Sequence, residues 1–129
     1  AMGGTQQWRW IYCAMSLNIS IVILRPRMKK AEARHMGDVA SMGCVVCRNA
    51  AYGESPAEIH HIRNGQGMSQ RASNYEVIPL CPAHHRTGGF GIAIHAGQET
   101  WEAAFGTERN LLNQTLNDVK SLRGQIIGR

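Results

Sequence analysis

Aromatic residues are scarce in this chain of 129 residues, which has two Phe, three Tyr and three Trp. A single domain of this size can bury a hydrophobic core, but one with so few large rings gains from an added constraint such as a structural metal ion. The apolar fraction of 43% is ordinary for a globular protein and excludes a chain that is disordered throughout. We therefore expect one small folded domain.

A long hydrophobic run is also lacking. The most apolar stretch, residues 11–24, is interrupted by Ser16, Asn18 and Ser20, and it is shorter than the ~20 residues that a membrane-spanning helix needs. Arg9 precedes this stretch as in a signal peptide, but no cleavage site of small residues follows it. These absences predict a cytoplasmic protein with no membrane partner.

Neither positive nor negative charge strongly dominates this chain, whose net charge is a mildly basic +5. Three of the positive charges, Arg9, Arg25 and Arg27, lie in the first 27 residues, whose composition differs from that of the rest. Charge therefore permits nucleic acid as a partner without demanding it. We expect an N-terminal extension over residues 1–27 and the folded domain over residues 28–129.

The chain does have a dense cluster of Cys and His between residues 44 and 85, with three of its four cysteines and four of its six histidines. A Cys-x-x-Cys and a Cys-x-x-His pair supply four candidate ligands: Cys44, Cys47, Cys81 and His84. A tetrahedral zinc ion takes four such ligands, so the spacing predicts a structural zinc site. The alternative is a set of buried free cysteines. A redox Cys-x-x-Cys is disfavoured because no βαβ pattern surrounds it.

Two pairs of adjacent histidines, His60-His61 and His84-His85, are harder to explain by packing. Neighbours on a strand point to opposite faces, so His60 and His61 cannot both bind one ion on a regular strand. One of them can bind an ion while the other reaches a substrate. Neighbours on a helix are about 100° apart. If His84 faces the zinc ion, His85 is therefore directed elsewhere, toward His60.

The periodicity and turn residues predict an α+β fold. The strands expected are residues 57–62 and 76–80, joined by a polar loop over residues 64–74. The helices expected are residues 28–42, a short helix after Pro82, residues 98–105, and a final helix capped by Thr107 that ends near Arg123 at Gly124.

In this order, His60-His61-Ile62, a loop, Ile78-Pro79-Leu80-Cys81 and His84-His85 resemble the core of HNH endonucleases, the ββα-metal fold. With the preceding Cys-x-x-Cys and the downstream His95, residues 43–97 more closely resemble the Ref family of phage recombination-enhancement nucleases, which RecA directs. The resemblance implies a small ββα-metal core held by zinc, with flanking helices.

The resemblance implies a metal-dependent DNA endonuclease of phage or prophage origin. It makes His61 the general base that activates water, and it assigns His60, His85 and His95 to a catalytic Mg²⁺ or Mn²⁺ ion. His95 could instead simply end an apolar strand. Arg63, Arg71 and Arg86 border this site and are the expected contacts to DNA phosphates.

One position departs from the pattern. Many HNH proteins have Asn five residues before the cysteine of the last element, where this chain has Glu76. Either Asn74 braces the loop, or Glu76 orients His61. Relatives that depend on RecA carry a long basic arm before the nuclease core, and residues 1–43 are not such an arm. Dependence on a RecA filament, the natural catalytic metal and the oligomeric state therefore stay open.

Two other classes of protein compete with this interpretation. A non-catalytic zinc-knuckle module that binds nucleic acid or protein would use the same four zinc ligands. It would leave four histidines without a common purpose: His60, His61, His85 and His95. A redox protein would leave the histidines unexplained altogether.

Overall fold

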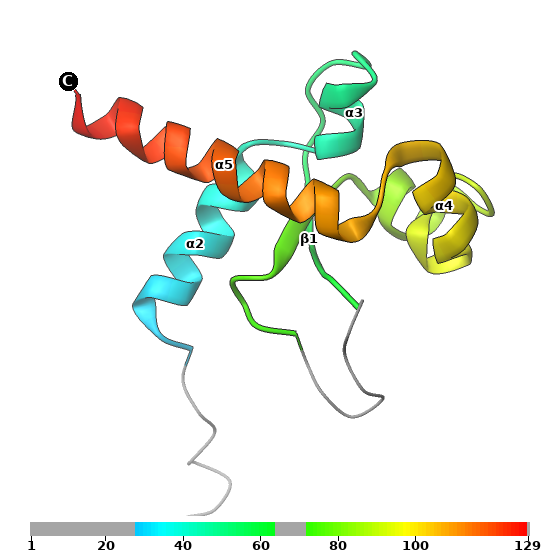
Figure 1. Cartoon of the computed structure of the whole chain (residues 1–129), viewed down its shortest axis with the longest axis horizontal. Coiled ribbons are helices and arrows are strands. Elements are labelled where there is room, and N and C mark those ends of the chain that lie inside the picture. The colour runs from blue at the N-terminus through cyan, green and yellow to red at the C-terminus, as the bar shows by residue number, and fades with distance from the viewer. Residues whose placement is uncertain (1–27, 64–71, 129) are drawn as a thin grey trace, which may run out of the picture.

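The computed structural model describes residues 28–63 and 72–128. The elements in chain order are α2 (Lys30–Ser41), α3 (Val45–Asn49), β1 (Glu58–His61), β2 (Val77–Leu80), η1 (Ala83–Thr87), η2 (Ile94–Ala96), α4 (Gln98–Phe105) and α5 (Glu108–Ile127) (Figure 1). Helices and a two-stranded sheet confirm the expected α+β class. The expected N-terminal extension, Cys13 and Arg71 lie outside the described residues.

The sheet is an antiparallel pair in which His60 lies opposite Ile78, and His61 lies opposite Val77. Pro79 lies inside β2 opposite Ile59. Proline has no backbone N–H to donate, but each strand of a two-stranded sheet has only one neighbour, so its outer edge needs no donor. Both strands lie within one residue of the ranges expected from sequence.

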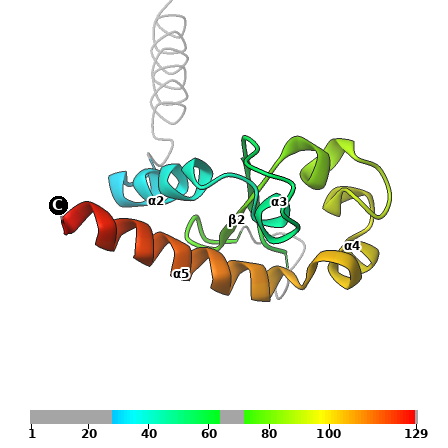
Figure 2. The ribbon, with the colours of Figure 1, turned by 90° about the horizontal axis from the view of Figure 1, so that it is seen from above.

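The two faces of the sheet pack against different apolar clusters. Ile78 and Leu80 of β2 join the larger cluster, which also contains Trp101 of α4 and Leu111 of α5. Val77, which precedes Ile78 and lies on the opposite face, packs with a smaller cluster that includes Val39 of α2 and Val119 of α5. Helix α5 therefore contributes to both clusters along its length, and α2 lies beside it (Figure 2).

The final helix is longer than predicted. Thr107 caps it as expected, accepting a hydrogen bond from the backbone N–H of Asn110 at 3.2 Å. The helix does not end at Gly124, however, but continues to Ile127. A glycine inside a helix costs only about 1 kcal/mol relative to alanine, and this cost does not stop the helix here. A second difference is α3, a short helix after Cys44 that the sequence reading did not anticipate.

None of the helices in residues 28–63 and 72–128 is long and apolar enough to cross a membrane.

Candidate metal centres and active site

The four residues predicted to bind structural zinc come together at one buried point: Cys44, Cys47, Cys81 and His84. The sulfurs of Cys47 and Cys81 are 3.9 Å apart. Nδ1 of His84 lies 3.1 Å from the sulfur of Cys81 and 3.5 Å from that of Cys47. A tetrahedral ion with Zn–S bonds of about 2.3 Å separates its sulfur ligands by roughly 3.8 Å. The group could therefore hold one tetrahedral metal ion.

The electrostatics of this cluster favour a cation. Burial raises the pKa of the Cys44 thiol to about 11, so this residue becomes a thiolate ligand at neutral pH only beside a positive charge. Burial also acts to raise the pKa of Cys81, but the backbone N–H of His84 and the neighbouring thiols outweigh it and lower that pKa. Burial lowers the pKa of His84 and keeps its ring neutral, the form that binds metal.

A second cluster contains three histidines from three different elements. His60 comes from β1, His85 from η1 and His95 from η2. The ring centroids are 5.2 Å apart for His60 and His85, 5.3 Å for His60 and His95, and 4.7 Å for His85 and His95. One nitrogen from each ring lies within 4.8 Å of the others, so these rings could also hold an ion.

Two glutamates fix how two of these rings are oriented. Oε1 of Glu108 is 2.8 Å from Nε2 of His60, and Oε2 of Glu58 is 2.8 Å from Nδ1 of His85. An ionised carboxylate only accepts hydrogen bonds, so the facing nitrogen must carry the hydrogen. In the neutral rings, the lone pairs are then left on Nδ1 of His60 and Nε2 of His85. Carboxylates behind metal-binding histidines orient them in this way.

Each of these carboxylates has its own source of stabilisation. The hydrogen bonds from Arg86, and then from His85, lower the pKa of Glu58 to about 2, so this side chain is ionised. Glu108 is fully buried as the first residue of α5. There it accepts the backbone N–H of Arg63 at 2.9 Å, and the helix N-terminus favours its negative charge.

His61 faces the other way from His60. It shares its sheet face with Ile59 and Val77, but unlike them it is exposed, because it ends the strand. Its Nε2 lies 3.0 Å from Oδ1 of Asn74. An amide oxygen only accepts, so Nε2 carries the hydrogen and Nδ1 keeps its lone pair.

A residue on α2 fixes the orientation of the Asn74 amide. Nδ2 of Asn74 donates to Oε2 of Glu32 at 3.4 Å, which turns the amide oxygen toward His61. Glu76, the residue predicted to orient His61, instead lies 3.5 Å from the guanidinium of Arg109. Of the two alternatives, Asn74 is therefore the one that contacts His61.

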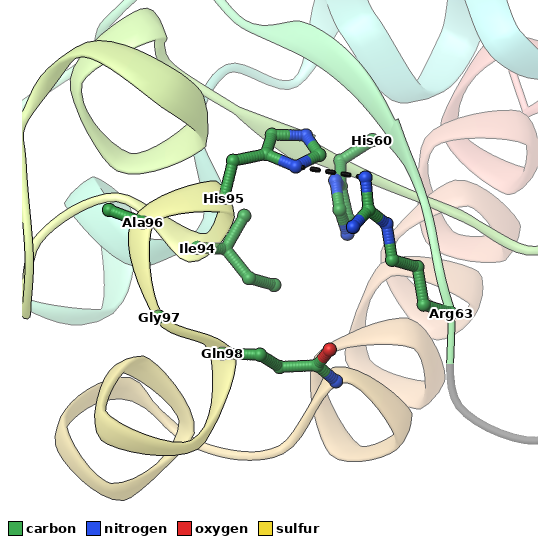
Figure 3. A pocket seen from close by; sticks show the side chains of 7 residues that line it. All are labelled: His60, Arg63, Ile94, His95, Ala96, Gly97 and Gln98. Carbon is green, nitrogen blue, oxygen red and sulfur yellow. Dashed lines mark hydrogen bonds between the residues drawn. The ribbon is translucent and has the colours of Figure 1, made fainter.

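A small open cavity borders the histidine cluster. It measures about 160 Å³ and is lined by His60, Arg63, Ile94, His95, Ala96, Gly97 and Gln98. In Figure 3 the rings of His60 and His95 point toward the guanidinium of Arg63, which donates to Nδ1 of His95 at 3.0 Å. Burial is the main cause that lowers the pKa of His95, and the charge of Arg63 lowers it further. Arg63 thus places one positive charge beside the cluster.

Arg86, which was also predicted to contact DNA, lies in different surroundings from Arg63. Arg86 is half-exposed, and its guanidinium pairs with Oε1 of Glu58 at 2.7 Å. It therefore neutralises the carboxylate behind His85 as well as facing solvent.

The sequence alone assigned no role in the site to Glu108 or to Glu58. Glu58 carried one usable signal, since it lies two residues before His60 and so on the same sheet face. Nothing local to Glu108 points to His60. Only the packing of α5 brings the two together.

Comparison with known proteins identifies a family for this chain. A family model described as recombination enhancement, RecA-dependent nuclease matches residues 29–120. No curated protein matches the chain. The family match covers both clusters and confirms the resemblance to Ref proteins that the sequence motifs indicate. This chain therefore belongs to the family of recombination-enhancing, RecA-dependent nucleases.

Proposed function

We propose that this protein is a DNA endonuclease of the HNH type, with residues 28–129 as its nuclease domain. In this proposal His61 is the general base, and one divalent ion is bound by His60, His85 and, once the guanidinium of Arg63 moves off its Nδ1, His95. The observation that carries the proposal is the pair of carboxylates, Glu108 and Glu58, behind two of the three clustered histidines. Family membership supplies the reaction class, nuclease, and makes a RecA filament on DNA the proposed partner.

Cys44, Cys47, Cys81 and His84 would hold a structural zinc ion, which would keep the site in shape. Cys81 and His84 lie on either side of the start of η1, the same short helix that carries His85. Cys44 and Cys47 flank the start of α3. Joining these two segments therefore fixes where His85 lies relative to β1. This would compensate for the small hydrophobic core of a domain of this size.

A bound Mg²⁺ or Mn²⁺ ion would act as a Lewis acid toward the phosphate and stabilise the leaving 3′ oxygen. His61 supplies the base. With the hydrogen on Nε2 held by Asn74, Nδ1 can take a proton from the attacking water. His61 follows His60 at the end of β1 but projects from the opposite face of the strand, so in this proposal the phosphate and the attacking water lie at the strand end, where a group can reach both side chains. The guanidinium of Arg63 beside His95 offers a charge for a phosphate oxygen.

A non-catalytic zinc-knuckle module explains less. It needs the Cys3His group, but it assigns no purpose to a second cluster whose rings are oriented by Glu58 and Glu108. Nor does it account for an exposed His61 whose tautomer is set by Asn74.

The test is cleavage of supercoiled plasmid with Mg²⁺ or Mn²⁺, with and without RecA and single-stranded DNA. His61→Ala should cut at least about 100-fold more slowly, since a general base contributes roughly 10²–10⁴-fold. Its zinc content and circular dichroism should be unchanged. Asn117→Ala, at an exposed position on α5, is the control and should cut like wild type.

A folded, zinc-loaded His61→Ala protein that cuts as fast as wild type would exclude His61 as the base. If wild type binds DNA but does not cut it under any of these conditions, the zinc-knuckle alternative holds instead.

A further inference from the structure

Phe90 is a large apolar side chain exposed to solvent, with 73% of its surface accessible. It lies in the segment that joins η1 to η2, the two short helices that carry His85 and His95. Single exposed apolar residues are common and need no explanation by themselves. The local backbone and the position of this ring carry the argument.

The backbone around Phe90 forms a closed turn. Gly89 and Gly91 on either side have φ values of +80° and +82°, a region that favours glycine. The carbonyl of Gly89 accepts from the backbone N–H groups of Ile92 at 3.2 Å and of Ala93 at 2.8 Å. Ala93 is fully buried and anchors the far side of the turn. The turn therefore holds the backbone that carries Phe90 in a defined place.

The ring lies against the rim of the cavity beside the histidine cluster. A Cβ atom placed on Gly97 would come within 2.7 Å of Cε2 of Phe90, so the ring packs directly on Gly97 and would have to shift if a larger residue stood there. Gly97 lines the same cavity as His60 and His95 (Figure 3). One edge of the ring thus contacts the cavity wall, while most of its surface remains open to solvent.

We propose that Phe90 stacks on an unpaired base of the DNA strand whose phosphate occupies the histidine cluster. This inference rests on the proposed nuclease function. A nucleotide places its base next to its phosphate, and Phe90 contacts Gly97, which lines the cavity beside the histidine cluster where that phosphate would lie. Bases stack on aromatic side chains with little regard to sequence, because every base has a π face. In an intact duplex both faces are covered by neighbouring bases, so the favoured substrate is DNA with unpaired nucleotides at the cut.

The test measures binding rather than cleavage, in a His61→Ala background so that the DNA stays intact. The probes are a short thymidine oligonucleotide, an abasic strand of the same length and a fully paired duplex. When Phe90 is present, the thymidine strand should bind at least about fivefold more tightly than the abasic strand. A tenfold change in affinity corresponds to about 1.4 kcal/mol, so this difference corresponds to ~1 kcal/mol of stacking free energy. In Phe90→Ala the two strands should bind equally, and Phe90→Tyr should restore the difference.

Ile127→Ala serves as the control, because Ile127 is 84% exposed at the far end of α5. It should preserve the difference between the two strands. The proposal is overturned if removing the bases weakens binding equally with and without Phe90, or if Phe90→Ala weakens duplex binding as much as single-strand binding. If the bases strengthen binding only when Phe90 is present, but the protein with His61 intact never cuts DNA, the stacking is supported and the nuclease function is rejected. If that protein cuts DNA but the effect of the bases does not depend on Phe90, the nuclease function is supported and the stacking is rejected.

Discussion

The carboxylate of Glu108 lies 2.8 Å from Nε2 of His60, although the two residues are 48 positions apart in the sequence. Both side chains are almost completely buried. The contact joins the first residue of the last helix to the first strand of the sheet, and it fixes which nitrogen of His60 keeps its lone pair. We conclude that α5 is part of the candidate active site as well as part of the core.

Replacing Glu108 by glutamine should weaken binding of the catalytic ion. The amide keeps the size of the side chain but loses its negative charge, and it can present either a donor or an acceptor to His60. Loss of such a partner typically costs 10–100-fold in metal affinity. The measurement is cleavage rate against Mn²⁺ concentration, and Glu99→Gln at an exposed position on α4 is the control. An unchanged Mn²⁺ dependence in folded Glu108→Gln would contradict this role.

Asn74→Ala should lower kcat by about tenfold or more and leave KM for DNA nearly unchanged. The substitution removes the acceptor that holds the hydrogen on Nε2 of His61, so the base is less often in the reactive tautomer. Glu76→Gln is the matched comparison, because Glu76 pairs with Arg109 and not with His61. Its kcat should stay within about threefold of wild type. If Glu76→Gln had the larger effect, the assignment of the two residues would be reversed.

Cys81→Ser should abolish the structural metal site and unfold the domain. The free energy of binding a structural zinc ion, about 10–16 kcal/mol, is comparable to the ~5–15 kcal/mol that stabilises a whole domain. Zinc content and far-ultraviolet circular dichroism measure the outcome, and prolonged treatment with a strong chelator should have the same effect on wild type. Cys13→Ser should keep its zinc. A native spectrum from zinc-free protein would show that the four ligands serve only packing.

His35 should make the free energy of unfolding depend on pH. It is buried in α2 against Tyr75, and burial is the largest cause that lowers its pKa from 6.5. Asp38 raises that pKa and Arg123 lowers it further, with smaller effects than burial. The unfolded chain then binds more protons below about pH 6.5, so stability falls as the pH drops through that value and is unaffected above it.

The measurement for His35 is denaturant unfolding between pH 5.5 and 7.5 at constant zinc concentration. His35→Phe keeps a ring against Tyr75 but cannot be protonated. Its stability should therefore fall less steeply on acidification than that of wild type. Any pH dependence that comes from the zinc ligands is common to both proteins and cancels in the comparison. Identical slopes would show that His35 is not protonated on unfolding.

The sequence by itself determined those features that depend on short spacings. The Cys-x-x-Cys and Cys-x-x-His pairs each place two ligands within one turn of chain, so their spacing is readable without coordinates. Strand alternation likewise separates His60 from His61, whatever surrounds them. The α+β class and the limits of β1 and β2 followed from the same local periodicities.

Only the tertiary structure decided which distant groups meet these residues. Glu108 reaches His60 because α5 packs against β2, and the amide of Asn74 faces His61 while Glu32 of α2 holds its other end. The end of α5 beyond Gly124 was also missed, since a local stop signal can be overridden by the rest of the helix. Contacts between segments far apart in the chain depend on how whole helices pack. No local pattern of residues encodes that.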